Sequence, residues 1–146
     1  MGYDEELSWG DWVFVFGFPK GIKQITGGLV SKSPYPNKLA VGAVVTFGYS
    51  GGPVFAIPRS GGKLVLVGLI ESVPLTTLEF IAHERHLPQG YRLDKEDLQS
   101  LNVEKKNMVD YGTAYFVTSN VLKDFLRTER RNIEAAGIRL DEKFYR

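Results

Sequence analysis

Residues 11–17 read DWVFVFG, a run of alternating aromatic and β-branched side chains with a glycine at its end. In an extended chain successive side chains point to opposite faces, so the two valines share one face and the three aromatic rings share the other. Residues 64–67 (LVLV) are also apolar on both faces. A strand of this kind is buried on both sides, either by the chain's own helix and loops or by a surface outside this chain.

Five further stretches have the composition of short strands and are bounded by turns rich in Gly, Pro and Asn. They are residues 23–31, 39–47, 53–57, 63–73 and 112–117. No helical pattern interrupts the first five strands, which favours an antiparallel barrel or sandwich over a parallel sheet. Glycine makes up 16 of 146 residues, about 11% against a usual share of roughly 7%. This excess is typical of a β fold with many turns.

Residues 74–110 differ from the rest of the chain, because they are more polar and carry both histidines. We expect an inserted loop region between two strands, with one helical turn at residues 93–98. Asp94 is positioned to cap that turn, since a carboxylate at the N-cap accepts hydrogen bonds from the first free backbone amides.

Residues 119–136 predict a single C-terminal helix. Thr118 or Ser119 can cap its start, and Gly137 can end it. The apolar side chains recur at helical spacing, at positions 121, 122, 125 and 126, whereas charges of both signs occupy the other face. We interpret that charged face as solvated.

The composition excludes several classes of function. Lys plus Arg number 18 and Asp plus Glu 17, a net charge of +1, which gives no reason to expect nucleic acid or an anionic membrane as partner. The absence of cysteine excludes disulfides, Cys-based zinc sites and thiol nucleophiles. No segment suits a membrane helix and the start of the chain lacks a signal-peptide core, so we expect a cytoplasmic protein. No cofactor is expected.

The segment most indicative of chemistry is residues 48–54, GYSGGPV. As G-x-S-x-G it matches a nucleophile elbow, but that elbow requires a helix after the serine, and residues 53–57 favour a strand. As G-x-S-G-G-P it resembles the nucleophile loop of trypsin-like serine peptidases. There the amides of Gly48 and Ser50 would hold a substrate oxyanion, and glycine permits the backbone twist. A glycine-rich turn without chemistry is the alternative interpretation.

Three ordered motifs extend the resemblance to HtrA-like (Deg) trypsin-fold peptidases: residues 10–19, 25–31 and 112–120. They are similar to the first two strands of the second barrel in that family and to its last strand entering the C-terminal helix. The resemblance implies a mainly β, single-domain chain over residues 1–146. This would be an antiparallel six-stranded barrel with a C-terminal helix and a partly helical insertion.

The same resemblance implies a set of site residues. Ser50 would be the nucleophile, with an oxyanion hole at Gly48 and Ser50, and Tyr49 stands where trypsin has the acid that pairs with a new N-terminus. An activation by cleavage is therefore not expected. Val44 and Val45 would form the base of the specificity pocket. Glu71, Ser72 and Val73 would lie along the edge that pairs with the substrate backbone. Gly112 and Ala114 would form the opposite wall of the pocket.

The chain departs from this family in its catalytic base. Only 49 residues precede Ser50 and none is a histidine, whereas the family takes its histidine and aspartate from a first barrel upstream. Without a base a serine hydroxyl is a poor nucleophile. We expect a longer native protein or a separate chain to supply both groups to a polypeptide substrate site. Alternatives are a non-catalytic module that binds extended peptides, and an assembly role through a missing N-terminal barrel or self-association.

The two histidines, His83 and His86, follow the serine instead of preceding it. A folded-back loop could bring one of them to Ser50, since geometry and not chain order defines a triad. Residues 83–86 (HERH) fall one residue short of the H-E-x-x-H zinc pattern, and Glu79 would add a third ligand on one helical face. Surface histidines without a ligand are the simpler interpretation, so no metal is expected.

Overall fold

The computed structural model describes residues 7–83, 89–90, 92 and 94–144. The chain divides into two compact units. Residues 1–74 and 111–146 form the barrel unit, and residues 75–110 form the hairpin unit.

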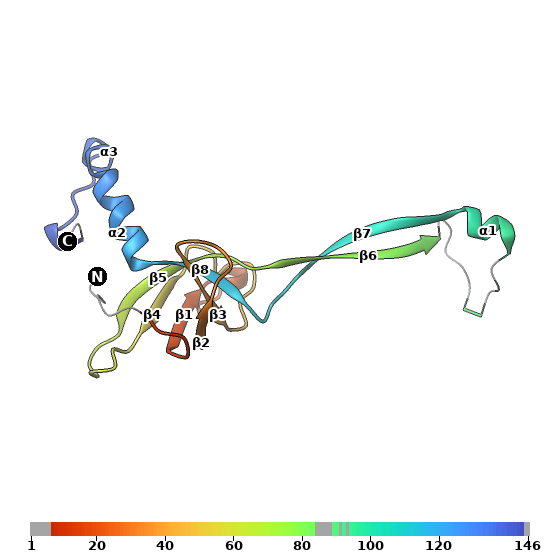
Figure 1. The fold of residues 1–146 in the computed structure, drawn as a ribbon. Helices are drawn as coiled ribbons and strands as arrows, with labels where there is room; N and C mark the ends of the chain where they lie inside the picture. Colours follow the sequence, from red (N-terminus) through yellow and green to blue (C-terminus); the bar gives the residue numbers. More distant parts are fainter. Residues whose placement is uncertain (1–6, 84–88, 91, 93, 145–146) are drawn as a thin grey trace. The chain divides into compact units, whose positions relative to one another are not determined.

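The barrel unit is a closed antiparallel barrel of six strands (Figure 1). Around the barrel the order is β1-β2-β3-β8-β5-β4, with β4 pairing back onto β1. The mainly β barrel predicted from the sequence is therefore confirmed, and the sandwich alternative is excluded. The six strands are β1 (Trp12–Gly17), β2 (Gln24–Lys32), β3 (Lys38–Gly42), β4 (Pro53–Ala56), β5 (Val65–Ser72) and β8 (Ala114–Thr118).

The barrel core is built from the inward side chains of every strand. Val13 and Val15 of β1 are fully buried, as are Val54 of β4 and Phe116 of β8. The valine face of the DWVFVFG run thus faces the core, whereas Trp12 on the other face is 53% exposed. Alternation along the strand explains why only one of its two apolar faces is covered.

The third predicted strand is shorter than expected, because β3 ends at Gly42 and residues 43–52 form an irregular loop. The prediction of strand over residues 43–47 was wrong. In this loop Ala43, Val45 and Tyr49 turn into the core instead of continuing the ladder with β8. Burial of these three side chains fixes the loop without strand pairing. A short 3-10 helix, η1 (Pro19–Gly21), lies between β1 and β2.

The C-terminal segment contains two helices where one was predicted. α2 (Ser119–Thr128) packs against β5 and β8, and α3 (Arg130–Ala135) follows after a break at Glu129, whose ψ of 5° is not helical. A 3-10 turn, η2 (Glu142–Phe144), comes later. In the part of the chain that the structure describes, no helix has the length and apolar character needed to cross a membrane.

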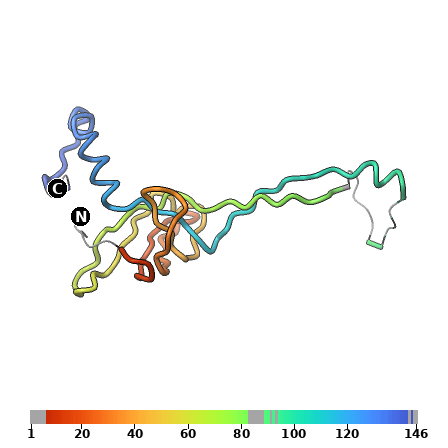
Figure 2. Tube along the Cα trace, in the orientation of Figure 1, coloured from red at the N-terminus to blue at the C-terminus, as the bar shows by residue number. Residues whose placement is uncertain are grey.

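The hairpin unit replaces the predicted loop region with two long strands, β6 (Leu75–His83) and β7 (Leu101–Val109), which run side by side in Figure 2. Their register is continuous from Leu75 opposite Val109 to His83 opposite Leu101. The predicted helical turn is α1 (Lys95–Gln99), and its Asp94 N-cap is confirmed. The Asp94 carboxylate accepts from the amides of Glu96 and Asp97 at 2.8 and 2.9 Å.

Candidate functional site

Ser50 lies in the loop of residues 43–52 that connects β3 to β4, and it is exposed. This loop sits at the end of the barrel where β1, β3 and β5 finish and where β2, β4 and β8 begin. Residues from every barrel strand can therefore contribute to the surface around the hydroxyl.

Glycine is required at several positions of this loop. Gly48 has a φ of +102°, and a Cβ there would approach the Cα of Pro19 to 2.6 Å. Gly51 also has a positive φ, of +77°. A Cβ on Gly52 would overlap the carbonyl oxygen of Phe16 on β1. Gly48 and Gly52 therefore let the loop pack directly on neighbouring backbone.

Tyr49 anchors the loop from inside the barrel. Its side chain is only 3% exposed and belongs to the core cluster. The ring fills the space next to Gly17, where any Cβ would overlap it. Its hydroxyl donates to Oε1 of Gln24 at 3.4 Å, and its carbonyl accepts from the amide of Gly52 at 2.8 Å. Ser50 is thus held between a buried neighbour and the start of β4.

This role of Tyr49 was not predicted from the sequence, although one signal was present. A large aromatic side chain within a run of four small residues has no turn-forming purpose, so its burial could have been inferred.

The polar backbone groups of the loop are only partly used. The carbonyl of Gly48 accepts from the amide of Phe18 at 2.9 Å, and the amide of Gly51 donates to the carbonyl of Ile70 at 2.8 Å. Within the described residues, the amides of Gly48 and Ser50 and the Ser50 hydroxyl have no hydrogen-bond partner. These three groups are available to a ligand.

The predicted substrate-contacting segments meet at this end of the barrel. The bond between Gly51 and Ile70 brings the loop beside the end of β5, next to Glu71 and Ser72. The amide of Val45 donates to the carbonyl of Tyr111 at 3.4 Å, which brings the loop beside the start of β8. Three stretches far apart in sequence therefore lie next to one another.

The predicted site residues differ in exposure. Val44 is 66% exposed, whereas Val45 and Ala114 are part of the buried core. Gly112 is exposed, Ser72 is partly buried, and Val73 packs partly buried against the core. Among the side chains of this set, Val44 presents the most apolar surface to a ligand.

Glu71 is also exposed, and its carboxylate forms an ion pair with the amine of Lys38 on β3. The same amine lies 5.3 Å from the centre of the Tyr35 ring. The Glu71 carboxylate, at the end of β5 beside the loop of residues 43–52, is therefore already paired with a cation.

The barrel unit contains no histidine, since His83 and His86 both belong to the hairpin unit. The His83 side chain and residues 84–86 lie outside the described residues. The metal arrangement weighed as an alternative required a helical face, but Glu79 lies on strand β6, where its carboxylate pairs with Lys105 at 2.6 Å. That arrangement was wrong, and the described ranges hold no group of three His, Asp or Glu side chains that could bind a metal.

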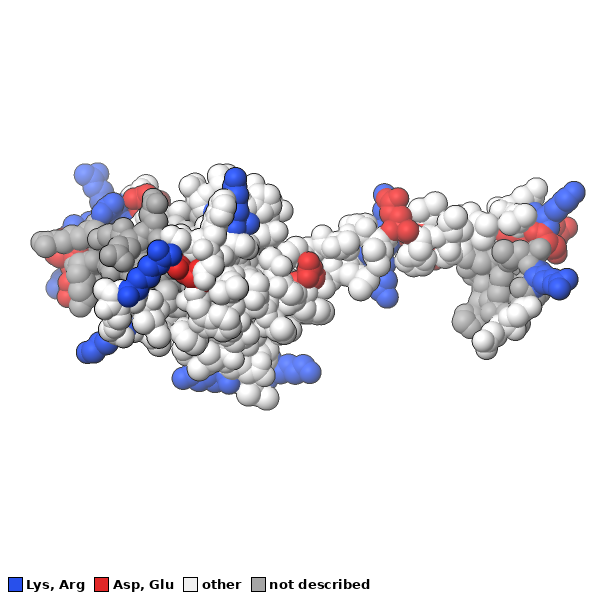
Figure 3. Space-filling view, turned by 60° about the horizontal axis from the view of Figure 1, so that its bottom comes forward, with Lys and Arg blue, Asp and Glu red and all other residues white. Residues whose placement is uncertain are grey.

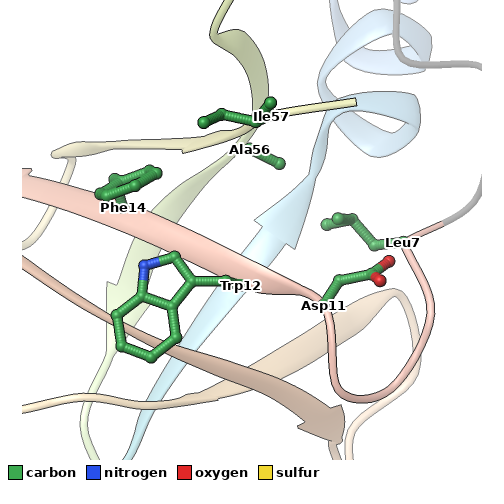
Figure 4. A pocket seen from close by; sticks show the side chains of 6 residues that line it. All are labelled: Leu7, Asp11, Trp12, Phe14, Ala56 and Ile57. Carbon is green, nitrogen blue, oxygen red and sulfur yellow. The ribbon is translucent and has the colours of Figure 1, made fainter. Parts of the chain in front are cut away.

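A pocket of about 140 Å³ lies on the outside of the barrel around the start of β1 (Figure 4). It lies away from Ser50, which follows β3 at the other end. Its lining is mostly apolar, with one carboxylate: Leu7, Asp11, Trp12, Phe14, Ala56 and Ile57.

The face seen in Figure 3 gives no sign of a binding site for polyanions among the described residues. On the face seen in Figure 3, acidic and basic side chains are interspersed among the described residues, with no broad field of one sign.

Compared with known proteins, this chain matches no family model, no curated protein and no solved structure.

Proposed function

We propose that this chain is the nucleophile-bearing barrel of a trypsin-like, HtrA-related serine endopeptidase. The observation that carries the proposal is that Ser50 is exposed in a glycine-rich loop. The backbone amides of Ser50 and Gly48 have no hydrogen-bond partner among the described residues. The closed six-stranded barrel beneath it is the fold that the sequence resemblance implies.

In the proposed reaction, Ser50 Oγ attacks the carbonyl carbon of a peptide bond. The hydroxyl proton passes to an imidazole supplied from outside the barrel unit, and the carbonyl oxygen becomes an oxyanion that accepts from the amides of Gly48 and Ser50. The C–N bond then breaks, and the leaving amine takes the proton. Water cleaves the resulting serine ester, which releases the acid and restores the hydroxyl. Val44 would contact a small or medium apolar side chain of the substrate.

A peptidyl boronic acid with a valine-like side chain tests the nucleophile and the oxyanion hole without a base. We expect boron NMR to report a tetrahedral adduct on Ser50, which is lost in Ser50→Ala. Ser60 is the matched control, because it is also exposed and also precedes two glycines. Ser60→Ala should leave the adduct unchanged. A folded chain that forms no adduct, or forms it equally at Ser60, would contradict the proposal.

A fluorophosphonate probe tests the statement that the base comes from elsewhere. The isolated chain should remain unlabelled by intact mass, since an unassisted hydroxyl reacts poorly. Labelling that disappears in Ser50→Ala would show that the chain or a second copy of it provides the base, and His83 and His86 would be replaced next.

A second candidate is a non-catalytic module that binds extended peptides, and the lack of a histidine in the barrel unit favours it. The barrel is closed, so a peptide would have to add beyond the paired region of β5, near Val73. Peptide affinity that survives Ser50→Ala but falls in Val73→Asp would support this function over catalysis.

A further inference from the structure

The outer side of β1, β2 and β4 carries a continuous set of large apolar side chains. In the register of the sheet, Trp12 lies opposite Leu29, and Phe16 lies opposite Ile25. Phe14 lies between them on β1, opposite Gly27 and Phe55. We call this set, together with Ile57, the apolar face: Trp12, Phe14, Phe16, Ile25, Leu29, Phe55 and Ile57.

The aromatic rings of the apolar face pack against one another, and Trp12 stays more than half exposed while the three phenylalanines are partly buried. The Trp12 and Phe14 rings meet edge-on at 6.5 Å, and those of Phe16 and Phe55 at 5.3 Å. The Trp12 ring covers Gly27, where a Cβ would lie 3.0 Å from it. These contacts between rings restrict the side chains before any partner binds. The side chains therefore lose little conformational entropy when the apolar face is covered.

The exposed area of this face is comparable to what a stable interface requires. Trp12, Ile25, Leu29 and Ile57 are 53–58% exposed. At roughly 150–250 Å² for a large side chain, these four expose on the order of 400 Å², to which the three part-exposed phenylalanines add. A standard interface buries about 800 Å² per partner, of which about 57%, or roughly 450 Å², is apolar.

The apolar face also lacks charge, and the molecule as a whole is nearly neutral. The residues of the apolar face are all uncharged, the one charged residue of β1, β2 and β4 is the exposed Lys32 at the end of β2, and the net charge is +1. At its rim Asp11 pairs with Arg59 at 2.8 Å. Two copies would therefore meet without repulsion between like charges.

The shape of the face suits contact with itself. The 140 Å³ pocket opens between Trp12, Phe14 and Ile57 (Figure 4). An apolar cavity of about 150 Å³ holds one benzene molecule, so this pocket fits one aromatic side chain. The same face presents such side chains, and a contact between identical surfaces requires that the surface be complementary to itself.

From these observations we infer that the apolar face is the interface of a two-fold symmetric dimer of this chain. The barrel is closed, so the copies associate through side chains and not by strand addition. The inference goes beyond the proposed function and does not depend on it, because Ser50→Ala is expected to leave the dimer unchanged.

Sedimentation velocity over a range of concentrations tests the inference. We expect a dimer that dissociates on dilution, and Ile25→Lys should be monomeric at every concentration. The matched control is Phe125→Lys on α2, because Phe125 is 59% exposed but lies outside the apolar face. Circular dichroism checks folding, and Leu29→Lys replaces Ile25→Lys if that variant fails to fold.

Tryptophan emission locates the contact. The chain has two tryptophans, so Trp9→Phe leaves Trp12 as the only reporter. Its emission should shift to the blue as the dimer forms, since its ring becomes buried. A chain that is monomeric at all concentrations, a dimer broken by Phe125→Lys and not by Ile25→Lys, or a dimer without the Trp12 shift would each overturn the inference.

Discussion

At the scale of single residues, the serine loop is defined by where a Cβ cannot be accommodated. Gly48, Gly52 and Gly17 each face an atom that a Cβ would approach too closely: backbone of Pro19, backbone of Phe16 and the ring of Tyr49. The G-x-S-G-G-P pattern includes Gly48 and Gly52, and glycine was expected there to permit the backbone twist. It did not reveal Gly17, because the neighbour that requires it lies 32 residues further along the chain and is met only after folding.

Gly48→Ala and Gly61→Ala separate backbone strain from steric overlap. Both glycines have a positive φ, +102° and +79°, but only Gly48 has an obstructing neighbour, since nothing lies within 4 Å of a Cβ on Gly61. Gly61→Ala should destabilise by about 1 kcal/mol, and Gly48→Ala by about 1–3 kcal/mol more because of the overlap. Urea unfolding measures both.

Loss of the boronate adduct is expected in Gly48→Ala alone. Equal free energies of unfolding for the two variants would mean that Pro19 yields to the methyl group, so that steric overlap with Pro19 would not be the reason for glycine at position 48.

Asp11 is expected to make the stability of the chain depend on pH in acid. Burial raises the pKa of Asp11, but the hydrogen bonds from Arg59 and the Ser8 amide and the charge of Arg59 outweigh it, so the pKa lies below its ordinary value. A lowered folded-state pKa stabilises the fold above the unfolded pKa near 4, and the stabilisation is lost as the pH falls through the folded pKa.

The test is the melting temperature of Asp11→Asn against wild type. At pH 7 the variant should be less stable by about 1 kcal/mol or less, because the pair lies at the surface. The difference should stay constant down to about pH 5 and vanish in stronger acid. A difference that persists below pH 2 would mean that the charge of Asp11 is not its cause.

At the scale of elements, the two units are covered to very different degrees. Every barrel strand has a neighbour on each side and contributes to a common core, whereas β6 and β7 pair only with each other. Leu75, Ile81 and Val103 of this hairpin are each more than 60% exposed. The sequence predicted a loop region here because the segment is more polar than the rest of the chain and carries both histidines. In β6 and β7 polar and apolar residues mix on both faces, so the alternation that marks a half-buried strand is absent.

Hydrogen exchange followed by mass spectrometry should distinguish the units. An isolated two-stranded hairpin is only marginally stable in water. We expect the free energy of opening to be lower for the amides of β6 and β7 than for those of β1 and β8. The difference should be on the order of 1 kcal/mol or more. Equal protection in the two units would show that something covers the hairpin in solution.

At the scale of the whole molecule, positive and negative charges nearly cancel, whereas exposed apolar side chains gather on one side of the barrel. The net charge of +1 leaves hydrophobic contact as the main means by which copies of the chain can associate. One side of the barrel supplies that contact surface.

The salt dependence of the dimer follows from this balance. The dissociation constant should be about the same at low and high NaCl, because screening acts only on charged contacts. Sodium sulfate should tighten it, since excluded salts favour apolar burial. Dissociation by NaCl would point to an interface of ion pairs elsewhere on the surface, and sedimentation equilibrium measures each case.

Side-chain alternation and local backbone geometry predicted most of the barrel strands, the capped turn at Asp94 and the glycine-rich loop around Ser50, with residues 43–47 as the exception. The packing of the folded chain was needed to show that Val45 and Ala114 belong to the core, that Tyr49 is buried beneath Ser50, and which face of β1 stays open. Each of these depends on which distant strands become neighbours, and hydrophobic alternation does not distinguish a face covered by the chain from one left for a partner.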